Sequence, residues 1–123
     1  MAAKKTVLAI DDSLTIRELI CFVLGNAGYD VVLAEDGEEG LTQLARCNPN
    51  VIITDVNMPR LDGLGFIERA RASGLARATP ILVLTTESNI EQKTRAKAAG
   101  ATGWIVKPFN PVQLIEAVQR VAL

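Results

Sequence analysis

Acidic, hydroxyl and amine side chains stand directly after short apolar runs in this chain. These residues are Asp11, Asp12, Asp55, Thr85 and Lys107. If the first and third runs are neighbouring strands of a parallel sheet, the three carboxylates converge at one edge of that sheet. Two unit charges about 4 Å apart repel by roughly 4 kcal/mol at an effective dielectric near 20. Three uncompensated carboxylates would move apart or raise one pKa, whereas Mg²⁺, which prefers oxygen ligands, would hold them together.

A phosphoryl group is the chemical group that this set of side chains suits. Lys107 supplies a positive charge and Thr85 a hydroxyl donor for phosphoryl oxygens. One carboxylate can act as the nucleophile and become an aspartyl phosphate. The metal ion and the lysine would then stabilise charge on the transferred group, which is the main demand of phosphoryl transfer.

Each of these residues also has a structural explanation when it is taken alone. Asp12 or Ser13 could cap the first helix, and Asp55 could begin a turn. Lys107 could be a solvated lysine and Thr85 an ordinary strand residue. Their joint occurrence at four strand ends favours the functional interpretation.

Five apolar runs alternate with stretches in which apolar residues recur at helical spacing. The expected strands are Val7–Ile10, Val31–Ala34, Val51–Thr54, Ile81–Leu84 and Trp104–Val106. Continuous runs rich in Val and Ile are typical of strands that are covered on both faces. The (βα)₅ alternation therefore predicts a doubly wound α/β fold, a five-stranded parallel sheet with helices on both faces. Such sheets carry their sites at the carboxyl ends of the strands.

Cap residues mark the ends of the expected helices. The start signals are Asp36 with Glu39, Ser88 with Glu91, and Asn110 before Pro111, and the stop signals are Gly28, Gly74 and Gly100. The fourth helix, from about Asn89 to Ala99, has Ile90 as its single large apolar residue. This composition predicts weak anchoring, which suits a mobile helix or a contact surface.

Composition limits the classes of function. A chain of 123 residues suits one domain, and 13 basic against 14 acidic residues give a net charge of −1. This balance does not favour binding to nucleic acid or to anionic membranes. The absence of histidine excludes histidine ligands and a phosphohistidine on this chain. The first apolar run is too short for a signal peptide or a membrane span, so we expect a cytoplasmic protein with Cys21 and Cys47 as reduced packing residues.

The chain resembles the receiver domain of two-component response regulators, of the single-domain chemotaxis (CheY-like) type. The motifs that carry the resemblance are Asp11-Asp12-Ser13, Asp55-Val56-Asn57-Met58-Pro59, Asp62-Gly63, Thr85-Thr86-Glu87 and Lys107-Pro108-Phe109. The resemblance extends over essentially the whole chain. It implies a single receiver domain over residues 1–123, with a flavodoxin-like fold and strand order 2-1-3-4-5.

The resemblance also implies how the metal ion and the phosphoryl group are bound. Asp55 would be the phosphoacceptor, and Lys107 would contact the phosphoryl oxygens. Asp12 and Asp55 would bind Mg²⁺, for which Mn²⁺ can substitute, together with the backbone carbonyl of Asn57. Asp11 would act on the ion mainly through water.

Further roles implied by the resemblance concern the oxygen cage and the switch. Thr85 would be the second side chain on the phosphoryl oxygens, and the N–H groups of Asn57 and Thr86 would complete the cage. Asn57 and Glu87 would tune the rate at which the phosphoryl group is lost. Trp104 stands where the family usually has Tyr or Phe, an aromatic residue that rotates inward when Thr85 moves.

The function implied by the resemblance is a phosphorylation-activated signalling switch that is not an enzyme, beyond catalysing its own phosphorylation and dephosphorylation. The donor would be the phosphohistidine of a sensor histidine kinase of the chemotaxis type. The target would be the flagellar motor switch protein or another signalling protein, bound through the face of the fourth helix, fifth strand and fifth helix. We expect a monomer that delivers its signal by protein contact, since no output domain follows Leu123.

Two other functions compete with this one. A phosphorelay intermediate or phosphate sink would pass the phosphoryl group between histidine proteins, and the sequence barely separates this function from the first. A phosphatase of the haloacid-dehalogenase type would need an Asp-x-Asp motif and usually a cap insertion. The adjacent Asp11 and Asp12 and the short chain do not favour the phosphatase, and the acidic first loop does not favour a flavodoxin.

Overall fold

Strands and helices alternate along the computed structural model, which describes residues 4–86 and 90–122. The strands are β1 (Thr6–Ile10), β2 (Asp30–Ala34), β3 (Val51–Asp55), β4 (Ile81–Thr86) and β5 (Gly103–Lys107), and the helices are α1 (Leu14–Asn26), α2 (Gly37–Cys47), α3 (Gly63–Ala72), α4 (Ile90–Ala99) and α5 (Pro111–Val121). Each apolar run lies inside one of the strands, so the predicted (βα)₅ alternation is confirmed. No helix among the described residues is both long and apolar enough to cross a bilayer.

The sheet has the order β2-β1-β3-β4-β5, and all four pairs of neighbouring strands are parallel. The flavodoxin-like prediction, including the strand order, is therefore confirmed. In the β1–β3 pair, Ile10 lies opposite Thr54. The residues that follow Ile10 and Thr54 therefore leave the sheet side by side.

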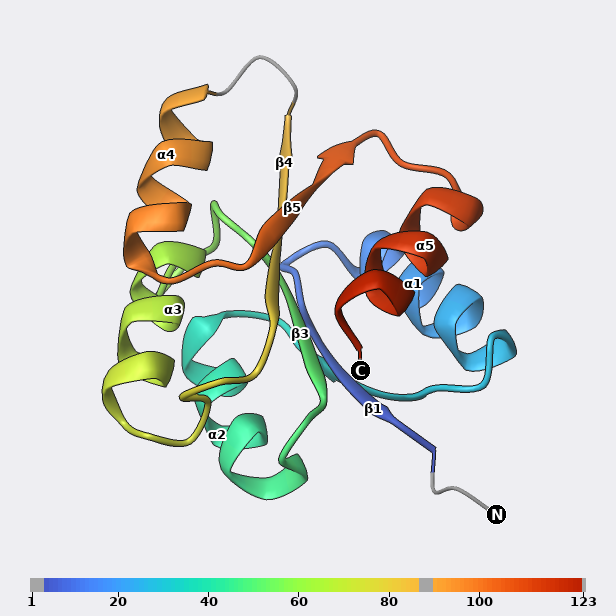
Figure 1. Ribbon diagram of the computed structural model, residues 1–123, viewed down its shortest axis with the longest axis horizontal. Coiled ribbons are helices and arrows are strands. Elements are labelled where there is room, and N and C mark those ends of the chain that lie inside the picture. The colour runs from blue at the N-terminus through green and yellow to red at the C-terminus, as the bar shows by residue number, and fades with distance from the viewer. Residues whose placement is uncertain (1–3, 87–89, 123) are drawn as a thin grey trace.

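Helices α2, α3 and α4 lie on one side of the sheet and α1 and α5 on the other (Figure 1). An apolar layer lies between the sheet and the helices on each face. Leu8 and Ile10 pack in the layer that includes residues of α2, α3 and α4, whereas Val7 and Ala9 pack in the layer that includes residues of α1 and α5. Successive side chains of a strand point to opposite faces, so a strand covered on both faces must be apolar throughout. All four of these β1 side chains are fully buried.

Helix α4 has the small apolar face that its composition predicts. Ala96 is its buried residue, and Ile90 is 73% exposed. Its C-terminal end is nevertheless held by polar contacts, because the Arg71 guanidinium donates to the Gly100 carbonyl from two nitrogens, at 3.2 and 2.8 Å. The C-terminal end of α4 is thus attached by hydrogen bonds from Arg71, whereas Ile90 at its N-terminal end is exposed.

Most of the predicted cap residues hold their helix ends. Ser13, and not Asp12, caps α1, since the Ile16 N–H donates to the Ser13 hydroxyl oxygen at 3.3 Å. Asn110 and Gln113 form a full capping box at α5. The three stop glycines have positive φ angles, namely 98° at Gly28, 81° at Gly74 and 117° at Gly100. The capping box predicted from Ser88 lies outside the described residues.

The prediction of Cys21 as a packing residue is wrong. Cys21 is exposed on α1, whereas Cys47 is half-buried against the core, and both are free thiols in the described part of the chain. Cys21 follows the buried Ile20, and one residue rotates a helix by about 100°, so it lies off the buried stripe. Burial raises the pKa of the Cys47 thiol.

Asp36 ties the start of α2 to the loop after β3. Its carboxylate is almost fully buried, accepts the Glu39 N–H at 2.8 Å and forms an ion pair with Arg60. Burial alone would raise the pKa of Asp36, but the Glu39 N–H and the Arg60 guanidinium outweigh it and hold the pKa below its ordinary value of 3.8. Arg60 has a φ of 65°, which is unfavourable for a residue with a side chain, and its contacts to Asp36 and Glu35 compensate for this conformation.

Replacing Asp36 by alanine should destabilise the fold at pH 7 by about 1–2 kcal/mol, because it removes a helix cap and, with it, the ion pair to Arg60. A carboxylate whose pKa is lowered by folding stabilises the fold above its ordinary pKa, and this contribution disappears as the pH falls through the folded-state pKa. The difference between the wild type and Asp36→Ala should therefore shrink below pH 3.8. Urea unfolding of both proteins at pH 7 and near pH 3 measures this difference in the free energy of unfolding.

The matched control is Asp62→Ala, because Asp62 caps α3 through the Gly65 N–H but is exposed. Its cost at pH 7 should be about 0.5–1 kcal/mol. Equal costs for the two variants would show that the ion pair with Arg60 adds no stability.

Candidate functional site

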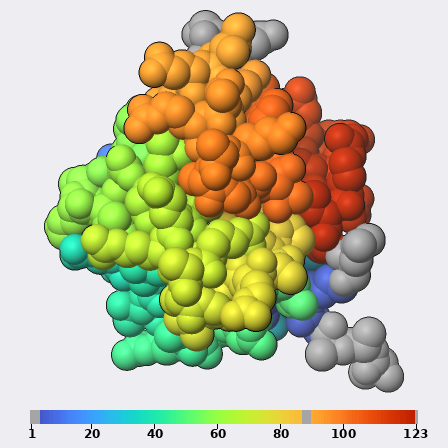
Figure 2. All heavy atoms as spheres, turned by 60° about the vertical axis from the view of Figure 1, so that its left-hand side comes forward, coloured from blue at the N-terminus to red at the C-terminus, as the bar shows by residue number. Residues whose placement is uncertain are grey.

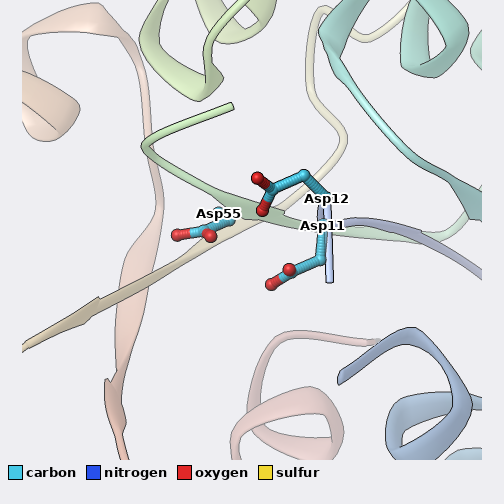
Figure 3. A group of neighbouring side chains, drawn as sticks. All are labelled: Asp11, Asp12 and Asp55. Carbon is cyan, nitrogen blue, oxygen red and sulfur yellow. The ribbon is translucent and has the colours of Figure 1, made fainter. Parts of the chain in front are cut away.

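Three carboxylates meet where β1 and β3 end. Asp11 and Asp12 follow Ile10 of β1, and Asp55 is the last residue of β3. One carboxylate oxygen from each of the three lies within 4.8 Å of the other two (Figure 3). We call Asp11, Asp12 and Asp55 the carboxylate cluster, and its convergence is the one expected from the strand ends.

Asp11 is the buried member of the carboxylate cluster. Its Oδ1 accepts the Ser13 N–H at 2.9 Å, while its buried Oδ2 has no hydrogen-bond partner within the described residues. Burial raises the pKa of the Asp11 carboxyl, and the nearby charges of Asp55 and Asp12 raise it further. The Ser13 N–H and the Lys107 ammonium oppose these effects.

A buried carboxylate oxygen without a hydrogen-bond donor is costly, and the Lys107 ammonium, 3.6 Å from Asp11 Oδ2, offsets this cost only in part. The carboxylate cluster supplies that unsatisfied oxygen together with further oxygen ligands from Asp12 and Asp55. This donor set fits a hard divalent cation such as Mg²⁺. Asp12 is exposed and Asp55 is partly exposed, so the cluster is open to solvent.

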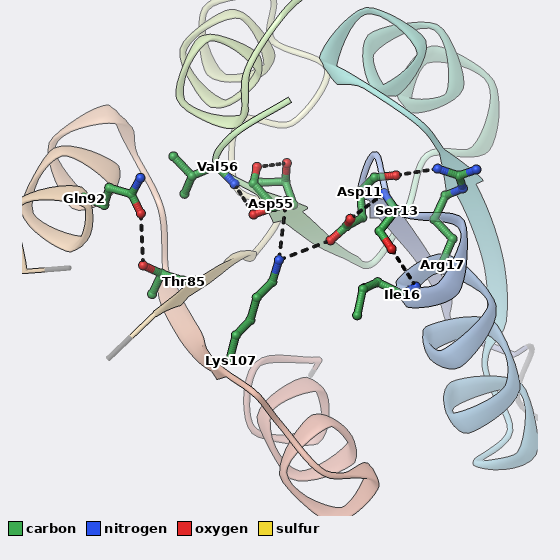
Figure 4. A network of polar contacts seen from close by, with 10 residues as sticks. Asp11, Ser13, Ile16, Arg17, Asp55, Val56, Thr85, Gln92 and Lys107 are labelled. Atoms are coloured by element: carbon green, nitrogen blue, oxygen red, sulfur yellow. Dashed lines mark hydrogen bonds and ion pairs between the residues drawn. The ribbon is translucent and has the colours of Figure 1, made fainter. Parts of the chain in front are cut away.

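Lys107 links β5 to the carboxylate cluster. Its Nζ lies 3.2 Å from Asp55 Oδ2 and 3.6 Å from Asp11 Oδ2 (Figure 4). Because β4 separates β5 from β3 in the sheet, the long lysine side chain has to reach past the end of β4. The ammonium group therefore partly offsets the repulsion between the two carboxylates.

Asp55 is oriented yet accessible. Its Oδ1 accepts the Val56 N–H at 2.8 Å, and 15% of its side chain is exposed. The backbone behind it is packed tightly, because a Cβ placed on Gly63 would lie 2.0 Å from the Asp55 carbonyl oxygen. The Gly63 N–H also donates to the Val56 carbonyl at 2.8 Å. Glycine at this position lets the start of α3 hold the Asp55 loop in place.

Thr85 is buried at the end of β4, and its hydroxyl is turned toward α4. Its Oγ1 lies 3.3 Å from Gln92 Oε1 (Figure 4). The Thr86 carbonyl oxygen is 3.4 Å away. Among the described residues, it makes no hydrogen bond to Asp55 or Lys107. The structure thus brings Lys107 to the carboxylate cluster but not the Thr85 hydroxyl.

The remaining candidate residues lie around the cluster or on β5. Asn57 and Thr86 are exposed, and Glu87 lies outside the described residues. Trp104 of β5 is 43% exposed, and the Lys93 ammonium lies 5.4 Å from the centre of its ring. Figure 2 shows α4, β5 and α5 side by side on one side of the surface, and we call this surface the output face.

Two polar residues that bear on this site were not predicted from the sequence. Arg17 donates to the Asp11 backbone carbonyl at 2.7 Å, and Gln92 contacts Thr85. Arg17 stands four residues after the cap residue Ser13, in the first turn of α1. This spacing could have indicated that its side chain reaches back to the backbone of the loop after β1. Gln92 gave no such signal, because it belongs to a helix that is polar nearly all around.

Comparisons with known proteins agree with this geometry. The profile of the response regulator receiver domain family matches residues 7–119. The solved structure of the chemotaxis protein CheY4 of Vibrio cholerae superposes with a TM-score of 0.92 at 48% identity, covering 97% of this chain and 99% of that one. The chemotaxis protein CheY1 of Helicobacter pylori is 39% identical over 115 residues, 92% of this chain and 93% of that protein.

A further curated relative is longer. The probable transcriptional regulator ycf27 of Porphyridium aerugineum is 37% identical over 96% of this chain, which corresponds to 48% of that protein. The chain spans about half the length of the transcriptional regulators among its first curated relatives.

Replacing Asp12 by alanine should weaken Mg²⁺ binding at least about tenfold without destabilising the metal-free fold. The variant removes an oxygen ligand and also reduces the repulsion within the carboxylate cluster. Magnesium titration by calorimetry and thermal melts in EDTA measure the two effects. Asp30→Ala, which removes an exposed acid at the start of β2, is the control and should leave Mg²⁺ binding unchanged. A loss of several degrees in the metal-free melt of Asp12→Ala would contradict this view of the cluster.

Proposed function

The chain belongs to the response regulator receiver domain family, and we propose that it is a signalling switch that is activated by phosphorylation of Asp55. The observation that carries this proposal is the contact of 3.2 Å between Lys107 Nζ and Asp55 Oδ2 beside the carboxylate cluster. It joins a nucleophile, a positive charge and a set of metal ligands within one partly exposed site. We further propose that residues 1–123 form one receiver domain.

In the proposed reaction, a carboxylate oxygen of Asp55 attacks the phosphorus of a phosphohistidine on a sensor kinase. The new O–P bond forms as the P–N bond breaks, and the electron pair of that bond stays on the imidazole nitrogen of the kinase. The Val56 N–H holds the carboxylate in place during this step. Lys107 neutralises charge on the phosphoryl oxygens, since its ammonium group already lies at the nucleophile.

The metal ligands of the proposal are Asp11, Asp12, Asp55 and the backbone carbonyl of Asn57, with Mg²⁺ or Mn²⁺ as the ion. A bound ion would supply positive charge that offsets both the carboxylate cluster and the incoming phosphoryl group. Asp11 acts on the ion mainly through water in this assignment, and its Oδ1 is already engaged by the Ser13 N–H.

We assign the remaining phosphoryl contacts to the Thr85 hydroxyl and to the N–H groups of Asn57 and Thr86. Asn57 and Glu87 tune the loss of the phosphoryl group. Because the Thr85 hydroxyl points toward α4 before phosphorylation, it has to turn toward Asp55 to complete the cage. Trp104 is the aromatic residue that responds to this movement of Thr85. The two residues are close in the sheet, because Thr85 of β4 pairs with Val106 of β5, the strand that also holds Trp104.

A chemotaxis pathway is the setting that we propose. Support comes from the chemotaxis proteins CheY4 and CheY1, each of which is matched over nearly its whole length. The partners would be a chemotaxis histidine kinase as donor and a flagellar motor switch protein, or another signalling protein, at the output face. The protein would act as a cytoplasmic monomer and catalyse only its own phosphorylation and dephosphorylation.

Phosphotransfer profiling tests the choice of partners. The chain is phosphorylated by purified sensor kinases, and both its forms are then tested for binding to a motor switch protein and for transfer to a histidine phosphotransfer protein. The proposal expects tighter binding of the phosphorylated form to the motor switch protein. Rapid onward transfer without such binding would support the phosphorelay alternative.

Replacing Asp55 by asparagine should reduce labelling by acetyl phosphate and Mg²⁺ to background, because the amide is not a competent nucleophile for phosphorus. Phosphoprotein gels or intact mass spectrometry detect the added group. Asp62→Asn, which changes an exposed acid seven residues away, should be labelled like the wild type. Strong labelling of Asp55→Asn would refute the assignment of the phosphoacceptor.

Trp104 should report the activated state through its fluorescence, since it is the single tryptophan of the chain and is 43% exposed. Inward rotation of the indole would move it into a less polar environment and shift its emission to shorter wavelength. The measurement adds Mg²⁺ with beryllium fluoride, a phosphoryl mimic, and compares the spectrum with that in Mg²⁺ alone. An unchanged spectrum despite binding of the mimic would show that Trp104 is not the switch residue.

A further inference from the structure

The two ends of helix α4 are held by different kinds of contact within the described residues. At the C-terminal end, Ala96 is fully buried and Arg71 donates twice to the Gly100 carbonyl. At the N-terminal end, Ile90 is 73% exposed and provides little apolar anchoring, and the Lys93 ammonium lies 5.4 Å from the centre of the Trp104 ring of β5. A polar contact of this end with the sheet is the hydrogen bond between Gln92 and Thr85.

The Thr85 hydroxyl has one proton and two acceptors within reach. Gln92 Oε1 lies at 3.3 Å and the Thr86 carbonyl at 3.4 Å, and the side chain is only 3% exposed. A buried hydroxyl needs an acceptor, and a single proton makes one good hydrogen bond at a time. A phosphoryl oxygen on Asp55 can therefore receive this proton only if the hydroxyl leaves Gln92.

We propose that Gln92 is a positioning residue that keeps the Thr85 hydroxyl turned away from Asp55 in the unphosphorylated protein. This inference rests on the proposed function, since the competition exists only if a phosphoryl group is attached to Asp55. Gln92 then opposes closure of the oxygen cage and sets part of the balance between the inactive and active states.

A mechanical consequence follows from the two unequal ends of α4. When Thr85 turns toward the phosphoryl group, the N-terminal part of α4 gives up this hydrogen bond with β4. The C-terminal end keeps its contacts with Arg71, which do not involve the site. Activation should therefore alter the first turns of α4 and leave its last turn in place, so the helix pivots about the Gly100 end.

The test replaces Gln92 by methionine, which has a similar length but accepts hydrogen bonds only weakly. With Mg²⁺ present, the variant should bind beryllium fluoride about three- to tenfold more tightly than the wild type, the factor that corresponds to one neutral hydrogen bond. Calorimetric titration measures the affinity, and a thermal melt checks that the variant is folded. Gln119→Met, at an exposed position of α5, is the matched control and should bind the mimic like the wild type.

The outcomes separate this inference from the proposed function. If the wild type does not bind beryllium fluoride, or if Asp55→Asn binds it equally well, the proposed function fails. If the wild type binds the mimic through Asp55 but Gln92→Met binds it no more tightly, the role of Gln92 is overturned. A merely structural role of Gln92 would lower the melting temperature without raising the affinity.

Hydrogen exchange provides a second measurement that does not depend on affinity. Adding the mimic to the wild type should speed exchange at the backbone amides of residues 94–96 and leave those of residues 98–100 unchanged. In Gln92→Met, the faster exchange should be present before the mimic is added. Uniform changes along α4, or none, would overturn the pivot.

Discussion

Three acidic side chains crowded at one edge of a parallel sheet are the constraint on which the rest of this structure depends. Parallel pairing of β1 with β3 forces Asp11, Asp12 and Asp55 together, and the sheet order leaves them no alternative. The Lys107 ammonium offsets part of this repulsion from two strands away. Three carboxylates against one ammonium leave the site with a net negative charge, which favours binding of a divalent cation.

The scaffold around these charges is rigid on one side and loosely held on the other. The loop after Asp55 is fixed by the close approach of Gly63 and by the Arg60 ion pair with Asp36. Across the site, α4 makes few apolar contacts at its first turns. A rigid nucleophile next to a loosely held helix suits a protein in which a local chemical event must alter a distant surface, because only the loosely held element can respond at low cost.

The strands and the (βα)₅ alternation can be predicted from short-range patterns, because runs of Val and Ile identify buried strands. The strand order that places β1 beside β3, and with it the carboxylate cluster, was implied by the resemblance to the receiver domain family and not by these patterns. The exposure of Cys21, the left-handed backbone of Arg60 and the contact between Gln92 and Thr85 could not be predicted. They depend on the rotation of a helix about its axis or on a side chain from a distant element, neither of which leaves a periodic signal.

The position of Lys107 in the chain has a consequence for biosynthesis. The acids of the carboxylate cluster belong to β1 and β3 and emerge from the ribosome early, whereas their counterion lies in β5, an edge strand near the C-terminus. A nascent chain that has completed its first four strands therefore carries an unbalanced acidic edge. The native charge arrangement therefore requires β5 to be in place beside β4.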